Sequence, residues 1–315
     1  MTFQWHEGIT TAAGGLVYSS VRPGGLSSVY LASLDANSRP SEWKRLDLHL
    51  GNMLNPNPNW SGDSNQIVYV ARNEDTGQTG GQVVHLHNLS SGEDREVYHA
   101  LGRVFCAWAT QQPNLFCTDT AEKTDIFSIA ADSREIARLH TFPAPRHLWI
   151  RSPSLDNRGL YIYDVLGDGE REVLLWEIAT ARETVLEQSA PGAYVFVSQD
   201  GRWLVRRAKP NIEVRPTSGG AWKSLAALRL SEATGHVNGN WLLYHDIDST
   251  GKHSLFRVPT AGGPPERLGN FPTNSPAGTI EISPDGSKIL VSAGEFETGY
   301  ELWSLENFVP PAPKR

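Results

Sequence analysis

Short apolar runs recur along this chain at nearly regular intervals. They begin at Leu16, Ile67, Leu115, Leu160, Trp203, Trp241 and Ile289. Successive starts lie between 38 and 51 residues apart, which brackets the roughly 40–45 residues that the four strands of one propeller blade occupy. The pattern predicts an all-β fold, a β-propeller of four-stranded antiparallel blades. Seven blades are favoured, and six are the alternative.

Each run stands in the same local order. A turn rich in Gly, Asp and Asn precedes it, at 61–64, 155–159, 199–201, 238–239 and 284–286. Such residues suit tight hairpin turns. A short strand follows, and then a second strand with alternating polarity, as at 28–31 and 301–305. Seven residues before the first of these strands stands a bulky residue that we assign to the inner strand a: Trp60, Trp108, Pro153, Phe196 and Ile282.

The repeat divides the chain into units at about 6–48, 53–99, 103–141, 147–188, 193–226, 235–271 and 277–307. Because Pro310 and Pro311 lack a backbone donor, we expect the seventh blade to end without an outer strand. Residues 2–5 are predicted to supply that strand and close the ring, which would remove its exposed edges. Residues 1–308 are then one propeller domain, followed by a flexible proline-rich tail at 309–315.

The two cysteines, Cys106 and Cys117, flank a predicted turn at 110–113. A hairpin centred there places Cys106 opposite Cys117 and Trp108 opposite Leu115. We expect the pair to remain buried thiols, because directly opposed strand positions strain a disulfide. A chain of this length needs no disulfide to hold its core.

One sequence element resembles a known family. The residues Ser-Pro-Asp-Gly-Ser-Lys-Ile at 283–289, with Glu-Leu-Trp-Ser-Leu-Glu-Asn-Phe at 301–308, resemble the WD-like repeat of TolB-type propellers. Weaker copies stand at 61–63 and 198–203. The family includes periplasmic partners of envelope proteins and the gating domain of prolyl-oligopeptidase-like enzymes. It also includes propellers fused to bacterial Ser/Thr kinases or winged-helix regulators. The resemblance implies a protein-interaction or ligand-sensing module within a larger bacterial regulatory or envelope protein.

Catalytic motifs are missing from the sequence. It contains no Gly-x-Ser-x-Gly elbow, no phosphate-binding Gly-rich loop and no His-Glu-x-x-His. We therefore favour a non-catalytic function. The alternative is a metal-dependent propeller enzyme, such as a polysaccharide lyase of the oligogalacturonate type. His6, His147 and His236 lie near predicted inner-strand starts and would form its axial site.

Three smaller groups carry ligand-type side chains. His85 and His87 alternate on one strand and face the same side, without an evident third ligand. The acidic loop at 164–170 holds closely spaced carboxylates, and Asp246 and Asp248 form a similar pair. We interpret them as ordinary polar hairpins and expect no cofactor. Calcium or another cation at an acidic loop or in the channel is the alternative.

Partners of propellers meet an axial end, and we expect a site on the loops between strands b and c. The predicted binding residues are Asp75, Asp164, Asp168, Asp246 and Glu297, with Arg72 and Arg207 as counter-charges and His147 and His236 nearer the axis. Their acidic excess would attract basic protein or peptide segments. A small ligand at the axial face is the other candidate.

Charge and hydropathy narrow the class of partner and compartment. A net charge of −7 and a pI near 5.8 disfavour nucleic acid. No apolar run approaches 18 residues, so we expect no membrane span. The N-terminal residues lack the basic and apolar regions of a signal peptide. The sequence is therefore compatible with a soluble bacterial protein of the periplasm or the cytoplasm.

Overall fold

The computed structural model describes most of the chain, and every regular element in the described part is a β-strand. The described residues are 9–12, 15–21, 25–51, 53, 56–72, 81–109, 112–143, 146–154, 156–166, 170–189, 194–198, 200–208, 210–228, 235–274, 277–296 and 300–306. Within these ranges there is no helix of the length and hydropathy needed to cross a membrane.

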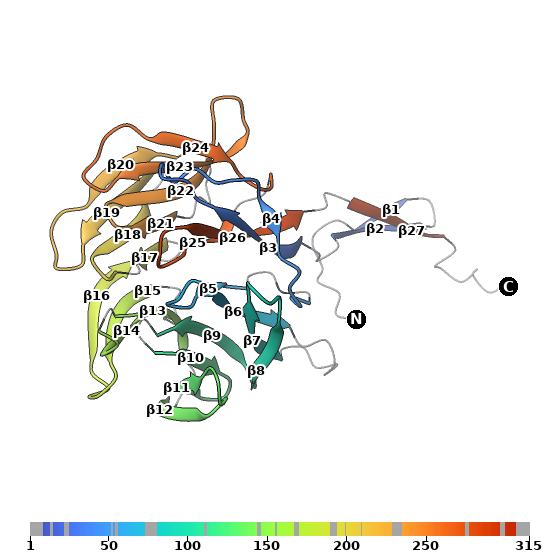
Figure 1. Cartoon of the computed structure of the whole chain (residues 1–315). Coiled ribbons are helices and arrows are strands. Elements are labelled where there is room, and N and C mark those ends of the chain that lie inside the picture. Colours follow the sequence, from blue (N-terminus) through green and yellow to red (C-terminus); the bar gives the residue numbers. More distant parts are fainter. Residues whose placement is uncertain are drawn as a thin grey trace, which may run out of the picture.

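Five four-stranded antiparallel sheets follow one another along the chain (Figure 1). Blade 1 contains β5 (Asn59–Trp60), β6 (Gln66–Arg72), β7 (Gln82–Asn88) and β8 (Asp94–Ala100). Blade 2 contains β9 (Arg103–Trp108), β10 (Asn114–Thr120), β11 (Thr124–Ala130) and β12 (Ile136–Phe142). Blade 3 contains β13 (His147–Pro153), β14 (Gly159–Val165), β15 (Arg171–Glu177) and β16 (Glu183–Ser189).

The next two blades have the same order. Blade 4 contains β17 (Tyr194–Val197), β18 (Trp203–Ala208), β19 (Asn211–Pro216) and β20 (Lys223–Ala227). Blade 5 contains β21 (Gly235–Asn238), β22 (Trp241–Ile247), β23 (His253–Pro259) and β24 (Glu266–Asn270). These five sheets confirm the predicted units from 53–99 to 235–271 to within a few residues. The exception is the inner strand of blade 1, β5, which begins at Asn59 and so starts later than its predicted unit.

Blade 6 combines strands from both ends of the chain. Its order is β25 (Ala277–Ile282), β26 (Lys288–Phe296), β3 (Gly25–Ser33) and β4 (Lys44–Arg45). The central pair runs antiparallel from Lys288 opposite Ser33 to Phe296 opposite Gly25. Figure 1 shows the blue strands β3 and β4 beside the red strands of the same sheet. The predicted units 6–48 and 277–307 therefore share one blade.

The propeller has six blades, and the favoured count of seven is wrong. The strands β1 (Ile9–Ala12), β2 (Gly15–Val21) and β27 (Tyr300–Glu306) form a separate three-stranded sheet, which Figure 1 shows beside the blades. Alternating polarity identifies a strand but does not name its partner. The run at Leu16 pairs with Leu305 in this sheet and was counted as a blade of its own. Residues 2–5, the predicted closing strand, and the tail at 309–315 lie outside the described residues.

The seven-residue offset between inner strand and strand b is confirmed on four blades. Trp60 lies opposite Ile67, Trp108 opposite Leu115, Pro153 opposite Leu160 and Ile282 opposite Ile289. On blade 4 the matching pair is Val197 and Leu204, while Phe196 lies opposite Val205. The difference arises because the tryptophan that begins β18 stands one residue before the first paired position.

Four of the turns between strands a and b share one hydrogen-bonded structure, built from a Ser and the Asp two residues later. The serine hydroxyl donates to the Asp carboxylate in the pairs Ser61/Asp63, Ser154/Asp156, Ser198/Asp200 and Ser283/Asp285, over 2.5–2.6 Å. Each serine oxygen also accepts the backbone N–H five residues on. The residue after the Asp has a positive φ of 55–73°. These bonds explain why the sequence repeats polar residues and glycine there.

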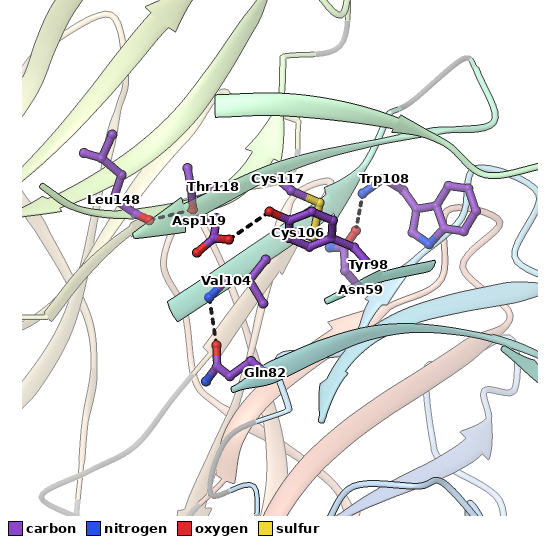
Figure 2. Close-up of a disulfide and its surroundings, with 10 residues drawn as sticks. All are labelled: Asn59, Gln82, Tyr98, Val104, Cys106, Trp108, Cys117, Thr118, Asp119 and Leu148. Carbon is purple, nitrogen blue, oxygen red and sulfur yellow. Dashed lines mark hydrogen bonds between the residues drawn. A yellow bond between two sulfur atoms is a disulfide. The ribbon is translucent and has the colours of Figure 1, made fainter. Parts of the chain in front are cut away.

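Neighbouring blades pack through apolar side chains and are also joined by hydrogen bonds. The backbone N–H of Trp108 donates to Asn59 Oδ1 over 3.0 Å, and the backbone N–H of Val104 donates to Gln82 Oε1 over 2.7 Å. Thr118 Oγ1 donates to the carbonyl of Leu148 over 2.8 Å. Figure 2 shows these contacts around blade 2.

The predicted register of the two cysteines is confirmed, since Cys106 lies opposite Cys117 between β9 and β10. The two residues form a disulfide with a Cα–Cα distance of 4.2 Å, so the expectation of free thiols is wrong (Figure 2). Both side chains are buried within the apolar core between blades 1 and 2. Direct opposition brought the sulfur atoms within bonding distance, and the expected strain did not prevent the bond.

Candidate functional site: an axial cavity

A cavity of about 440 Å³ lies where residues of all six blades meet. We call it the axial cavity. Its lining residues are Asn59, Trp60, Gly62, Trp108, Ala109, Ser152, Pro153, Asp200, Arg202, Val237, Gly239, Ser283 and Pro284. They end the inner strands or belong to the turns between strands a and b. The cavity therefore lies at the end of the propeller where those turns meet.

The wall of the axial cavity is largely apolar and carries two indoles, Trp60 and Trp108. The Trp60 Nε1–H donates to the carbonyl of Glu281 over 3.3 Å. By contrast, Trp108 Nε1 and the Ser152 hydroxyl are buried without a hydrogen-bond partner in the described part of the chain. An unsatisfied buried polar group costs about 1–3 kcal/mol. Buried polar atoms without a partner also occur away from the cavity among the described residues, as at Trp176 Nε1 and Trp203 Nε1, so these two atoms do not by themselves mark a ligand site.

The rim of the axial cavity carries charged side chains of both signs, held by hydrogen bonds within the turns. Asp200 Oδ2 lies 2.6 Å from Arg202 Nε. Burial raises the pKa of Asp200, but hydrogen bonds from Ser198 and Arg202 outweigh it and leave the pKa below its ordinary value. The hydrogen bond from Ser283, helped by the Ser287 N–H, lowers the pKa of Asp285 to about 2. These carboxylates are charged at neutral pH.

An ion-pair group crosses the centre of the propeller beyond the axial cavity. Glu281 on β25 is 4 % exposed. Its Oε2 lies 3.2 Å from His236 Nδ1 on β21, and its Oε1 lies 3.5 Å from Arg151 Nη2 on β13. Arg151 and Glu281 also line a second, smaller cavity of about 30 Å³. Because blades 3 and 6 are three blades apart, this contact spans the axis.

The histidines predicted near the axis have different positions. His236 is buried on an inner strand and pairs with Glu281. His147 begins β13 and is exposed, and His6 lies outside the described residues. In the described ranges, no group of three or more His, Cys, Asp and Glu side chains could hold a metal ion.

Two predicted rim carboxylates are buried strand residues. Asp164 is 3 % exposed on β14, and its Oδ2 accepts hydrogen bonds from Arg146 over 2.5–3.0 Å. Asp246 is 4 % exposed on β22, and its Oδ1 accepts the N–H of Ile247. The sequence pattern predicts both residues on the loops between strands b and c. The placement was wrong because each strand continues through the carboxylate before the loop begins.

The other predicted binding residues remain a prediction. Arg72 is exposed at the end of β6, and its N–H donates to the carbonyl of Leu50. Arg207 is half-buried on β18. Asp75, Asp168 and Glu297 lie outside the described residues.

His85 and His87 share one face of β7, as predicted, and both meet Asp94 on β8. Their Nδ1 atoms lie 2.9 and 3.2 Å from its carboxylate oxygens. Tyr69 donates its hydroxyl to the same carboxylate over 2.7 Å. Burial raises the pKa of Asp94, but the bonds from His85 and Tyr69 outweigh it, so the pKa lies below its ordinary value.

The axial cavity is not among the sites predicted from the sequence, although three of its wall residues are predicted on inner strands. Trp60, Trp108 and Pro153 share the seven-residue offset from strand b. That offset was the available signal. It indicates residues that end the inner strands, and these ends converge on the axis.

Comparison with known proteins supports the fold. No protein-family model and no curated protein sequence matches the chain. TolB from Acinetobacter baumannii superposes with a TM-score of 0.55 at 13% identity, over 95% of this chain and 80% of TolB. The putative TolB from Agrobacterium tumefaciens gives 0.58 at 15% identity, over 85% and 98%.

A peptidase propeller also superposes on the chain, with a lower TM-score. The β-propeller domain of the Trilobed protease from Pyrococcus furiosus gives a TM-score of 0.51 at 12% identity, over 95% of this chain and 92% of that domain. Identities this low show the fold alone. The chain is a β-propeller of the type seen in TolB, which confirms the predicted resemblance. Fusion to a kinase, regulator or peptidase stays a prediction.

Proposed function

We propose that this propeller is a non-catalytic interaction module that binds its ligand in the axial cavity. The observation that carries the proposal is the cavity of about 440 Å³ to which all six blades contribute. Ligand pockets typically measure roughly 300–1,000 Å³, with mostly apolar walls and a few oriented polar groups. The two indoles, the other apolar wall residues and the charged pair of Asp200 and Arg202 fit that description.

We further propose that the protein functions in an oxidising compartment such as the periplasm, as part of a larger envelope or regulatory protein. The Cys106–Cys117 disulfide supports this, because disulfides persist in oxidising compartments and are rare in the cytosol. The TolB-type fold agrees with an envelope setting. The metal-dependent lyase alternative draws support from His236 alone, since its Nδ1 faces Glu281 near the axis.

A cavity-blocking variant tests the proposed site. Pro284 is exposed and lines the axial cavity, so Pro284→Trp should obstruct it without disturbing the core. Pro264 is an exposed proline in a turn away from the cavity, and Pro264→Trp is the matched control. Peptide and metabolite libraries would be screened by thermal shift against both variants.

Ligands of the wild-type chain should fail to stabilise Pro284→Trp and should still stabilise Pro264→Trp. The opposite result would place the site elsewhere. If the ligands still bind Pro284→Trp but are lost on Arg72→Glu, the site lies on the loops between strands b and c, and the axial proposal is wrong.

A further inference from the structure

We propose that the three-stranded sheet of β1, β2 and β27 joins two copies of this chain, edge to edge, through β27. This pairing is separate from ligand binding in the axial cavity. Three features of the described strands support it: the register of β2 with β27, the condition of the outer strand edges, and the fit of β27 to a second copy of itself.

The pair of β2 and β27 continues the central ribbon of blade 6. In that blade, the pairing of β26 with β3 ends at Phe296 opposite Gly25. Pairing resumes at Tyr300 opposite Val21. Three residues on each strand lie between the two ladders, so the register is the same on both sides. Figure 1 shows the sheet of β1, β2 and β27 projecting from the propeller past β26 and β3.

The outer strands of the blades carry features that oppose pairing with another chain. On blades 1 to 5, the outer strand has a bulge, because one of its residues is skipped in the register against strand c. On blade 6, the outer strand β4 has only two residues. Bulges and very short strands are two means by which proteins protect the edges of their sheets.

The edge strand β27 has neither feature. Its seven residues pair with β2 without a shift in register. No other strand of the described ranges pairs with its outer side. Its sequence, Tyr-Glu-Leu-Trp-Ser-Leu-Glu, contains no proline and no lysine. Apart from the inner strands, which the other blades enclose around the axis, β27 is the only long edge strand without a bulge among the described elements.

The sequence of β27 fits an antiparallel copy of itself. A two-fold axis at Trp303, the central residue of the strand, sets the two tryptophan positions opposite each other. Aromatic residues at directly opposed positions favour strand pairing. The two glutamates, Glu301 and Glu306, then lie opposite Leu305 and Tyr300 of the second copy. No carboxylate therefore opposes another across the new pair.

The same two-fold axis closes the assembly. Within one copy, Ile9 lies opposite Tyr18 and Tyr18 lies opposite Trp303, so these three positions form one row on one face of the sheet. Pairing at Trp303 joins this row to its copy in a sheet of six strands. The remaining edges are two copies of β1, each with four residues. Because both long edges are used, the chains form a closed dimer and not an open fibre.

Pairing through β27 leaves the axial cavity open. Pro284, in the turn before β26, lines that cavity, and β26 runs away from the turn towards β27. One added strand pair buries less than the roughly 1,200–2,000 Å² of a stable interface. We therefore expect a dimer that dissociates on dilution.

Light scattering after size exclusion tests the proposal on the full chain, from about 1 µM to about 200 µM. The mass should rise with concentration from 34.7 kDa towards twice that value. Trp303→Lys and Trp303→Glu each set like charges opposite each other at the axis, and each should stay monomeric. An equimolar mixture of the two should recover the dimer, which misfolded variants could not do. Pro284→Trp is the control and should dimerise like the wild-type chain.

Single-cysteine variants test the register. Trp303→Cys sets two thiols directly opposite each other, an arrangement in which Cys106 and Cys117 form a disulfide within this chain. Air oxidation should therefore give a covalent dimer on a non-reducing gel. Ser304→Cys is the matched control, because its two thiols lie diagonally, with Cα atoms roughly 7–8 Å apart and too distant for a disulfide.

A wild-type chain that stays at 34.7 kDa at about 200 µM would exclude the second copy and leave β27 to a strand of another protein. Equal cross-linking of Trp303→Cys and Ser304→Cys would also overturn the proposal. So would a dimer that persists in Trp303→Lys, or one that is lost in Pro284→Trp. None of these results bears on the ligand screen, which tests the axial cavity separately.

Discussion

At the scale of single residues, buried carboxylates connect neighbouring blades. Asp119 on β10 accepts the Tyr98 hydroxyl over 2.8 Å and the N–H groups of Leu101 and Gly102 over 2.9 Å (Figure 2 shows the tyrosine). It is 6 % exposed. One side chain therefore holds the connection from blade 1 to blade 2.

We predict that Asp119→Ala lowers the free energy of unfolding by about 2–3 kcal/mol, because it leaves buried donors without an acceptor. Asp156→Ala is the control, because the Asp156 carboxylate also accepts a hydrogen bond but lies in an exposed turn. Urea denaturation of both variants measures the difference. Equal losses would show that burial of Asp119 adds nothing.

The lowered pKa of Asp94 predicts that the free energy of unfolding depends on pH. Its folded pKa lies below the ordinary value, so its contribution is fully present above the unfolded pKa near 4 and is lost as the pH falls through the folded pKa. The difference in unfolding free energy between the wild-type chain and Asp94→Asn should therefore shrink as the pH falls below about 4. Urea denaturation at several pH values between 5 and 2 measures it. A difference that stays constant over that range would contradict the prediction.

At the scale of elements, hairpins are defined by local turn chemistry. Gly201 and Gly286 occupy the same position in the repeated turn, with φ values of 67° and 73°. A Cβ on Gly201 would lie 2.2 Å from the Tyr161 hydroxyl, whereas a Cβ on Gly286 would meet nothing within 4 Å. A Cβ at Gly286 therefore adds only backbone strain, whereas a Cβ at Gly201 adds the same strain and a steric clash.

We predict that Gly286→Ala costs about 1 kcal/mol from the left-handed backbone alone. Gly201→Ala should cost more, because the Tyr161 side chain must also move. Thermal unfolding of the two variants provides the comparison. If Gly286→Ala proves the more damaging, the turns are not equivalent.

The disulfide is an element-scale constraint on the β9–β10 hairpin. Removing it in the double variant Cys106→Ala with Cys117→Ala should lower the free energy of unfolding by about 2–3 kcal/mol, since it closes a short loop of the unfolded chain. Chemical denaturation with and without a reducing agent measures this. The reducing agent should destabilise the wild-type chain and leave the variant unchanged.

At the scale of the whole molecule, blade 6 makes the two ends of the chain interdependent. β26 lies between β25 and β3, so half of the sheet comes from residues 25–45. The separate sheet of β1, β2 and β27 contributes no strand to any of the six blades.

We predict that residues 25–296 fold cooperatively as a six-bladed propeller, because they contain all of its strands. Residues 47–296 should lose cooperative unfolding, because β26 then exposes an unpaired edge and its apolar face. Circular dichroism during thermal unfolding distinguishes the two. A cooperative transition of 47–296 equal to that of 25–296 would show that β3 is dispensable.

Much of the candidate site was open to prediction, but its place on the propeller was not. The offset that assigns Trp60 and Trp108 to inner strands depends only on hairpin geometry, so sequence reasoning found it. The preference for the loops between strands b and c had no such basis. The burial of Asp164 and Asp246 depends on how far their strands continue and on packing around them, such as the hydrogen bonds from Arg146 to Asp164, which no sequence pattern indicates.

Local interactions explain what could be inferred from the amino-acid order: the strands, the Ser-x-Asp turns, and the register that opposes Cys106 to Cys117. Each depends on residues close together in the chain. The number of blades, the pairing of β26 with β3 and the axial cavity depend on contacts between residues hundreds of positions apart. Strands with the same alternating pattern can pair with many partners, and the choice among them comes from packing the complete set of blades around one axis.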